Sequence, residues 1–192
     1  LHRLIRRQRQ MCIRDRYKTA DGVVYAGNWV VDYNDKLGSN VALAEGTVGI
    51  ANYAFYNCSV LSGISMPTSV KTVGRAAFYD CTALTAVELP ATLEVIQDYT
   101  FYRCKNLNPI SMLPPMLTYI GRSAFYKCAS AASVSMVDTE NDVLQLPADV
   151  TYIGDYAFYC CGYSERASIE EEQYFNTYGI DVIILGDSVE YI

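Results

Sequence analysis

Histidine is almost absent from this chain of 192 residues, because His2 is the only one. Ser-His-Asp and Cys-His catalytic sites need a histidine base, and zinc sites commonly use histidine as a ligand. The seven cysteines include no Cys-x-x-Cys pair, so redox and zinc-ribbon sites lack their usual spacing. No apolar run is long enough to cross a membrane. We therefore expect no enzyme, no catalytic residue, no metal, no cofactor and no membrane insertion in this chain.

Basic residues are scarce beyond the first 18 positions. Seven of the 15 lysines and arginines lie in residues 1–18, where only Asp15 opposes them. Met11–Arg16 resembles translated adapter read-through, and we interpret residues 1–18 as a non-native leader; the alternative is a basic arm for nucleic acid or membrane. The remaining chain has 8 basic and 20 acidic residues. Because phosphate contacts supply most nucleic-acid affinity, we expect no nucleic-acid partner.

What the chain does have is a repeat. The motif Phe-Tyr-x-Cys occurs five times, with spacings of 23, 23, 24 and 33 residues, and a fixed period of this size indicates stacked structural repeats. The five copies begin at Phe55, Phe78, Phe101, Phe125 and Phe158. Five residues earlier a second apolar column contains Ile50, Val73, Ile96, Ile120 and Ile153, and twelve residues earlier a third contains Leu43, Met66, Leu89, Leu113 and Leu146.

Each repeat reads as a short series of extended pieces and a turn. Leu84–Leu89 alternates apolar and polar or small residues, which predicts a strand with one buried face. Pro90 ends this strand because proline has no N–H for a ladder. Leu93–Ile96 predicts a second extended piece, and the Ala-Phe-Tyr-x-Cys segment predicts a turn or a single helical turn.

These columns resemble the BspA-like leucine-rich repeats, a bacterial subclass with an Ala-Phe-x-x-Cys signature and a Leu-Pro after the strand. The resemblance implies an α/β repeat solenoid, wound as a right-handed leucine-rich repeat. A parallel β-sheet would line its concave face, and short turns or helical turns its convex face. It also implies an extracellular or cell-surface protein, often an adhesin or other binding protein.

The repeat divides the chain into three parts. Residues 1–18 are the basic leader, 19–40 a β-hairpin entry segment, and 41–192 a solenoid of five repeats plus a truncated sixth. Insertions fall near 137–143 and 163–180, and a capping-box pattern predicts an acidic helix over about 168–178. The truncated sixth copy leads us to expect a piece of a longer protein.

The cysteines form one column of five, at Cys58, Cys81, Cys104, Cys128 and Cys161. Free cysteine packs as a small apolar residue, and five in a row cannot all pair, so we favour packing over disulfides. Cys160 lies off this column and is the better candidate for an exposed thiol. Asp138, Glu140 and Asp142 alternate like cation ligands, but the calcium-loop glycine and glutamate are missing, which favours a solvated acidic loop.

Tyrosine is in excess, with 17 residues. The column Tyr56, Tyr79, Tyr102, Tyr126 and Tyr159 follows the phenylalanines so regularly that we favour a structural role for it. Tyrosines in the insertions are better ligand candidates, because tyrosine gives rigid contact area and a hydroxyl. The outward strand positions form a flat surface that suits a protein or glycan better than a small metabolite. The candidate ligand-binding residues are Tyr163, Tyr174, Tyr178, Glu88, Met112 and Gln145.

The predicted function is therefore that of a non-enzymatic extracellular or cell-surface binding module, with a protein or glycan as partner. Two alternatives remain open. The chain could be a structural spacer within a larger surface protein, or a repeat region appended to an enzyme whose catalytic domain lies outside this sequence.

Overall fold

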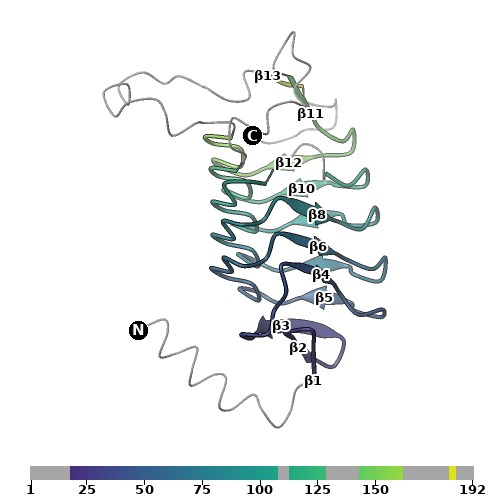
Figure 1. Ribbon diagram of the computed structural model, residues 1–192. Coiled ribbons are helices and arrows are strands. Elements are labelled where there is room, and N and C mark those ends of the chain that lie inside the picture. The colour runs from purple at the N-terminus through teal and green to yellow at the C-terminus, as the bar shows by residue number, and fades with distance from the viewer. Residues whose placement is uncertain (1–17, 108–112, 129–142, 162–181, 185–192) are drawn as a thin grey trace, which may run out of the picture.

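A computed structural model describes residues 18–107, 113–128, 143–161 and 182–184, the last segment and 143–145 by their backbone only. Figure 1 shows the repeats stacked one above another in chain order. The leader and both insertions, with the helix predicted over 168–178, fall mostly or wholly outside the described residues, as does the truncated sixth repeat except for 182–184. The described part of the chain contains strands and turns but no helix, so it includes no helix long and apolar enough to cross a membrane.

The two extended pieces of the repeat contribute strands to different sheets, of which the described residues form three. The strand before the Leu-Pro column forms a parallel three-stranded sheet of β4 (Asn40–Ala42), β6 (Gly63–Ser65) and β8 (Ala86–Glu88). The same position later in the chain gives β11 (Val143–Gln145) and β13 (Val182–Ile184), which pair with each other in parallel.

The second extended piece of each repeat lies in a larger, eight-stranded sheet. Its five repeat strands are β5 (Gly49–Ile50), β7 (Thr72–Val73), β9 (Val95–Ile96), β10 (Tyr119–Ile120) and β12 (Tyr152–Ile153), all parallel. The isoleucine and valine column faces inward, and Ile50, Ile96 and Ile120 are completely buried. The repeat solenoid with parallel β-structure is thus confirmed, and its described strands form three sheets rather than one.

A hairpin continues the larger sheet at the N-terminal side of the stack. β1 (Lys18–Ala20), β2 (Val23–Ala26) and β3 (Trp29–Tyr33) pair antiparallel, and β3 then pairs in parallel with β5. The Tyr33 ring stacks on Phe55, with 6.0 Å between the ring centroids. The hairpin therefore covers the first phenylalanine of the repeat column.

The Ala-Phe-Tyr-x-Cys segment consists of turns, and no helix occurs in the described residues, so the helical part of the expected α/β class is not seen there. The reason lies in the backbone two residues before and two residues after each phenylalanine, where φ is positive. These residues are Tyr53, Asn57, Ala76, Asp80, Tyr99, Arg103, Ser123, Lys127, Tyr156 and Cys160, with φ between 51° and 62°. A left-handed residue in each turn stops a right-handed helix from forming.

The core is a set of columns running along the stack. The phenylalanine rings of neighbouring repeats stack with centroid distances of 5.2 to 5.4 Å, from Phe55 to Phe158. The leucines that follow the cysteines, Leu61, Leu84 and Leu107, are buried beside them. Gly121 makes close approach possible, because a Cβ there would lie 2.4 Å from the Asp98 nitrogen of the preceding repeat. Each repeat therefore buries its apolar face against its neighbours.

Candidate functional site

The turn segment presents a row of tyrosines because its backbone hydrogen bonds alternate. The N–H groups of Tyr53, Phe55 and Asn57 donate to carbonyls of the next repeat, at 2.8 to 3.1 Å. The N–H groups between them donate within the same turn; that of Tyr56 reaches the Tyr53 carbonyl at 3.1 Å. Consecutive side chains point to opposite sides, so phenylalanine enters the core and the following tyrosine faces outward.

The outward tyrosines stack into a continuous ladder. Their ring centroids are 4.9, 4.6, 4.7 and 5.2 Å apart, and the rings are nearly parallel. The members are Tyr56, Tyr79, Tyr102, Tyr126 and Tyr159. The repeat alignment placed these five tyrosines in one column, and their rings stack along it.

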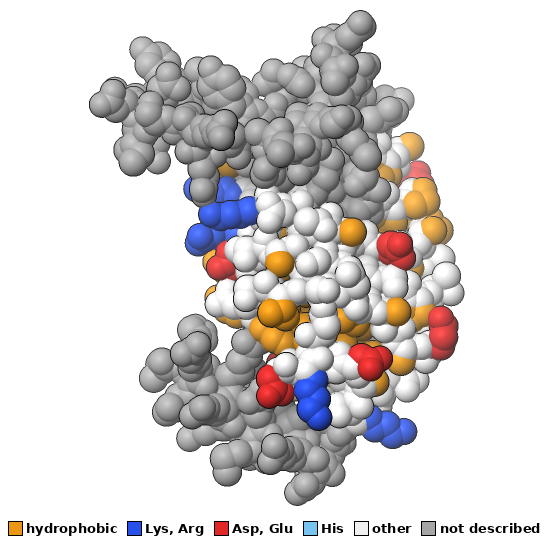
Figure 2. All heavy atoms as spheres, viewed as in Figure 1, with side chains coloured by type: hydrophobic (Ala, Val, Ile, Leu, Met, Phe, Trp, Pro, Cys, Tyr) orange, Lys and Arg blue, Asp and Glu red, His pale blue; other side chains and the backbone are white. Residues whose placement is uncertain are grey.

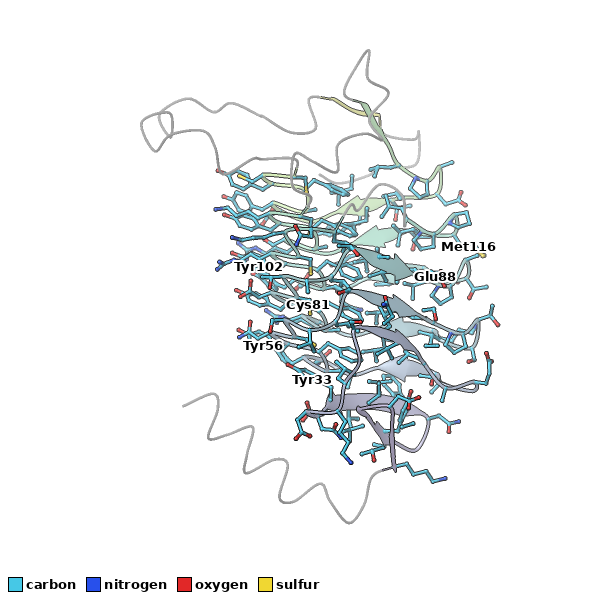
Figure 3. The ribbon with its side chains drawn as sticks, viewed as in Figure 1. Tyr33, Tyr56, Cys81, Glu88, Tyr102 and Met116 are labelled. Atoms are coloured by element: carbon cyan, nitrogen blue, oxygen red, sulfur yellow. The ribbon has the colours of Figure 1, made fainter. Side chains whose placement is uncertain are left out.

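Three further tyrosines lie edge-on against the ladder. Tyr53, Tyr99 and Tyr156 contact Tyr56, Tyr102 and Tyr159 at 5.7 to 5.9 Å between ring centroids. We call these eight residues the tyrosine ridge. Tyr53, Tyr156 and Tyr159 are 50%, 59% and 50% exposed, and the others are partly buried. Figure 3 shows the ridge, marked by Tyr56 and Tyr102, along the edge of the stack opposite Met116.

Four of the ridge hydroxyls have a raised pKa and stay protonated at neutral pH. Partial burial raises the pKa of Tyr79, Tyr102 and Tyr126, and the neighbouring tyrosines raise the pKa of Tyr79 and Tyr102 further. The pKa of Tyr159 is raised chiefly by the charge of Cys160 beside it. Each hydroxyl can therefore both donate and accept a hydrogen bond.

Charges of both signs flank the ridge. The Arg103 and Asp80 side chains approach to 3.6 Å, and those of Arg122 and Asp155 to 3.9 Å. The Arg75 guanidinium lies over the Tyr99 ring, 5.2 Å from its centroid. Figure 2 shows basic side chains beside acidic and hydrophobic ones at this edge. Such exposed pairs add little stability, but they present aromatic and ionic groups together.

The cysteine column lies behind the ridge and is inert. All five members are buried free thiols. Each from the second repeat on donates its S–H to the phenylalanine carbonyl of the preceding repeat, with Cys104 Sγ 3.0 Å from the Phe78 oxygen. Burial raises the pKa of Cys104 well above its ordinary value and that of Cys161 to about 12. Since the thiolate is the nucleophile, burial disfavours the reactive form of these thiols.

The family model described as a BspA type leucine rich repeat region, with six copies, matches residues 33–143 and 137–192. The chain belongs to the BspA-type leucine-rich repeat family. A search of the curated proteins finds no match.

Solved structures of leucine-rich proteins share the fold of this chain. A leucine-rich repeat protein from Bacteroides ovatus is 24% identical over 91% of this chain, with a TM-score of 0.58. A leucine rich cell surface protein from Faecalibacterium prausnitzii is 20% identical over 81%, also with a TM-score of 0.58. The chain spans 40% and 41% of the lengths of these two proteins, and identities this low establish the fold alone.

The structure describes few of the predicted ligand residues of this BspA-type chain. Glu88 ends β8 and is exposed on the three-stranded sheet, and Gln145 ends β11, whose backbone alone is described. Tyr163, Tyr174, Tyr178 and Met112 lie outside the described residues. Their roles stay predictions.

Sequence reasoning assigned the column of Tyr56 to structure and so did not propose the ridge as a binding surface. A periodic column suggests packing, yet periodicity cannot tell how much of each ring solvent reaches. The missed signal is the pairing of two tyrosine columns, at one residue after and two before the phenylalanine. One column supports the other, which leaves ring edges and hydroxyls exposed. Among the described residues, no cluster of three or more His, Cys, Asp or Glu side chains could hold a metal ion.

Proposed function

We propose that this chain is a non-enzymatic binding module of a bacterial cell surface, and that its protein or glycan partner binds along the tyrosine ridge. The observation that carries the proposal is the exposure of Tyr53, Tyr156 and Tyr159, each at least half exposed at the edge of an ordered ladder. Tyrosine supplies large, rigid, amphipathic contact area with little conformational entropy to lose on binding.

The order of the ridge favours binding over mere packing. Stacking fixes the ladder rings before any ligand arrives, so association immobilises few side chains. The flanking arginines and aspartates offer charged hydrogen bonds beside the rings. A ridge of this kind fits an extended partner that lies along the stack.

Surface location is part of the proposal and draws on a relative. The Faecalibacterium prausnitzii protein of the same fold is described as a cell surface protein. The alternatives, a spacer or a repeat region joined to an enzyme outside this sequence, assign no ligand to the ridge.

The test is binding of the purified chain to arrays of glycans and host surface proteins. The double variant Tyr53→Ser/Tyr156→Ser removes two exposed rings while leaving the stacked ladder. The control is Met116→Ser, since Met116 is equally exposed but lies on the opposite edge (Figure 3).

We expect saturable binding to at least one array member, weakened about tenfold or more by the double variant and unchanged by the control. Equal binding by both variants would contradict the ridge as the binding surface. An absence of saturable binding by the unaltered chain would favour the spacer.

A further inference from the structure

Trp29 is the only tryptophan of the chain, and its indole lies on the outer surface of the eight-stranded sheet. The next residue, Val30, is completely buried, and side chains alternate between the two faces of a strand. Trp29 is 40% exposed, which is unusual for so large an apolar side chain. Its position at the surface therefore calls for a physical account.

The indole lies flat on Gly49 of the neighbouring strand, with which Trp29 is in register. A Cβ built on Gly49 would lie 2.6 Å from Cζ3 and 2.8 Å from both Cε3 and Cη2 of the indole. If this Cβ lay in the plane of the ring, outside its edge at Cζ3, it would be clearly farther from Cε3 and Cη2 than from Cζ3. One face of the six-membered ring therefore covers the glycine backbone.

The 40% exposure of Trp29 leaves part of the indole accessible to solvent. On its second side Trp29 is in register with Ala26 of β2, another small residue that cannot cover the ring. Since one ring face lies on Gly49, we infer that the exposed 40% of the side chain is mainly the opposite face. The indole of Trp29 thus lies between two small residues in register with it, Gly49 on β5 and Ala26 on β2.

The indole begins an uncharged strip across the sheet. The register continues from Gly49 to Thr72, and the same outward position holds Val95, Tyr119 and Tyr152. Four strand spacings separate Trp29 from Tyr119, which is about 19 Å. Tyr119 and Tyr152 stack at 4.6 Å between ring centroids.

Polar groups border this strip. Thr72 is exposed, and so are Lys71 and Glu94, the residues that precede Thr72 and Val95. Thr72 offers a hydroxyl within the strip, and Lys71 and Glu94 offer an ammonium and a carboxylate directly before β7 and β9. The surface therefore suits a ligand with apolar faces and a polar rim.

A pyranose ring with equatorial hydroxyl groups has this character. Its C–H groups point from both faces and are polarised positive, whereas an aromatic face carries negative charge density. Its hydroxyl groups lie at the rim, where polar side chains can reach them. A flat strip longer than one sugar fits a chain of such units better than a single one.

We propose that Trp29 anchors a binding strip for an extended glycan of equatorially substituted pyranoses, such as a β-1,4-linked glucan or chitin chain. The strip uses a different column of the repeat from the tyrosine ridge and does not depend on it. A protein that docks on Trp29 is the competing outcome of the test.

The unique tryptophan reports directly on the strip. Cellohexaose and chitohexaose are titrated into the full chain while the Trp29 emission is recorded, with mannohexaose, which has an axial hydroxyl on each ring, as the matched probe. We expect a saturable emission change with cellohexaose or chitohexaose and a clearly weaker one with mannohexaose. No change with any of the three would overturn the proposal, and so would an equal response to mannohexaose.

Two variants separate this site from the ridge. Gly49→Ala places a methyl group where the indole lies, so it should tilt the ring and weaken binding by about tenfold or more. Tyr53→Ser/Tyr156→Ser should leave oligosaccharide binding unchanged, and the reverse pattern would refute the Trp29 site. If circular dichroism shows that Gly49→Ala does not fold, Trp29→Ala measured by calorimetry gives the same decision.

Discussion

At the scale of single residues, the thiol column shows why cysteine recurs in every repeat. The Phe78 carbonyl accepts the Cys81 N–H of its own repeat at 3.2 Å and the Cys104 S–H of the next at 3.0 Å. Alanine or valine would fill the space but could not donate. The position therefore requires a small, largely apolar side chain that can also act as a weak donor.

Removing one thiol should be measurable. Cys104→Ala leaves a small cavity and takes one donor from the Phe78 carbonyl, so we expect a loss of about 1–2 kcal/mol in the free energy of unfolding. Cys160→Ala is the control, because Cys160 is only half-buried and off the column. Urea titration of both variants checks this, and equal effects would argue against a role for the column thiol.

At the scale of the element, each turn has two left-handed residues with side chains rather than glycines. The sequence predicted a turn or one helical turn here. Its signal for left-handed backbone was weak, because these columns lack glycine and only Asn57 and Asp80 are of types that favour positive φ. Hydrogen bonds between repeats impose the conformation; the Lys127 N–H donates to the Tyr159 carbonyl at 2.9 Å. Local propensity alone could not have predicted it.

The φ of Lys127 is 53°, in the left-handed region. We therefore predict that glycine at this position gives a more stable protein than valine does. Glycine adopts the left-handed region freely, so Lys127→Gly should be neutral or slightly stabilising. Lys127→Val should cost about 1–2 kcal/mol because a β-branched residue clashes there.

Thermal unfolding of the two Lys127 variants measures the difference between them. Lys71 is the matched control, since it is exposed and its φ is not positive. Valine should be tolerated at Lys71 at least as well as glycine. A valine variant of Lys127 as stable as its glycine counterpart would contradict the argument.

At the scale of the whole molecule, the buried thiols couple stability to pH. Folding raises the pKa of Cys161 to about 12 from 9.0, and burial raises the pKa of Cys81, Cys104 and Cys128 as well. Above about pH 9 the unfolded chain loses thiol protons that the folded chain retains. Stability should therefore be complete below that pH and fall as the pH rises towards about 12.

Urea midpoints recorded from about pH 8 to about pH 11 give this dependence. The raised pKa values of Tyr79 and Tyr102 act in the same direction. Cys161→Ala removes one of the titrating thiols and should make the decline shallower. A midpoint that stays constant over this range would show that the column does not titrate as described.

The repeat columns made much of this architecture predictable. The phenylalanine, isoleucine and cysteine columns are buried as expected, apart from the partly buried Phe158, because a residue that recurs once per turn meets its own copies. The Trp29 site was not foreseen, since Trp29 lies outside the repeats and its partner Gly49 is defined only by strand register. Exposure of the ridge depends on how two tyrosine columns pack together, which a pattern of letters does not contain.

The S–H hydrogen bonds of the cysteine column all point in the same direction along the stack. In each, a thiol donates to the phenylalanine carbonyl of the preceding repeat. Each internal repeat therefore donates one S–H hydrogen bond through its cysteine and accepts one through its phenylalanine carbonyl. A gene that duplicates or deletes one whole repeat would keep every donor matched, whereas a change of half a repeat would leave a carbonyl and a thiol without each other. Evolution can therefore lengthen or shorten such a rod by complete units, without redesigning any junction.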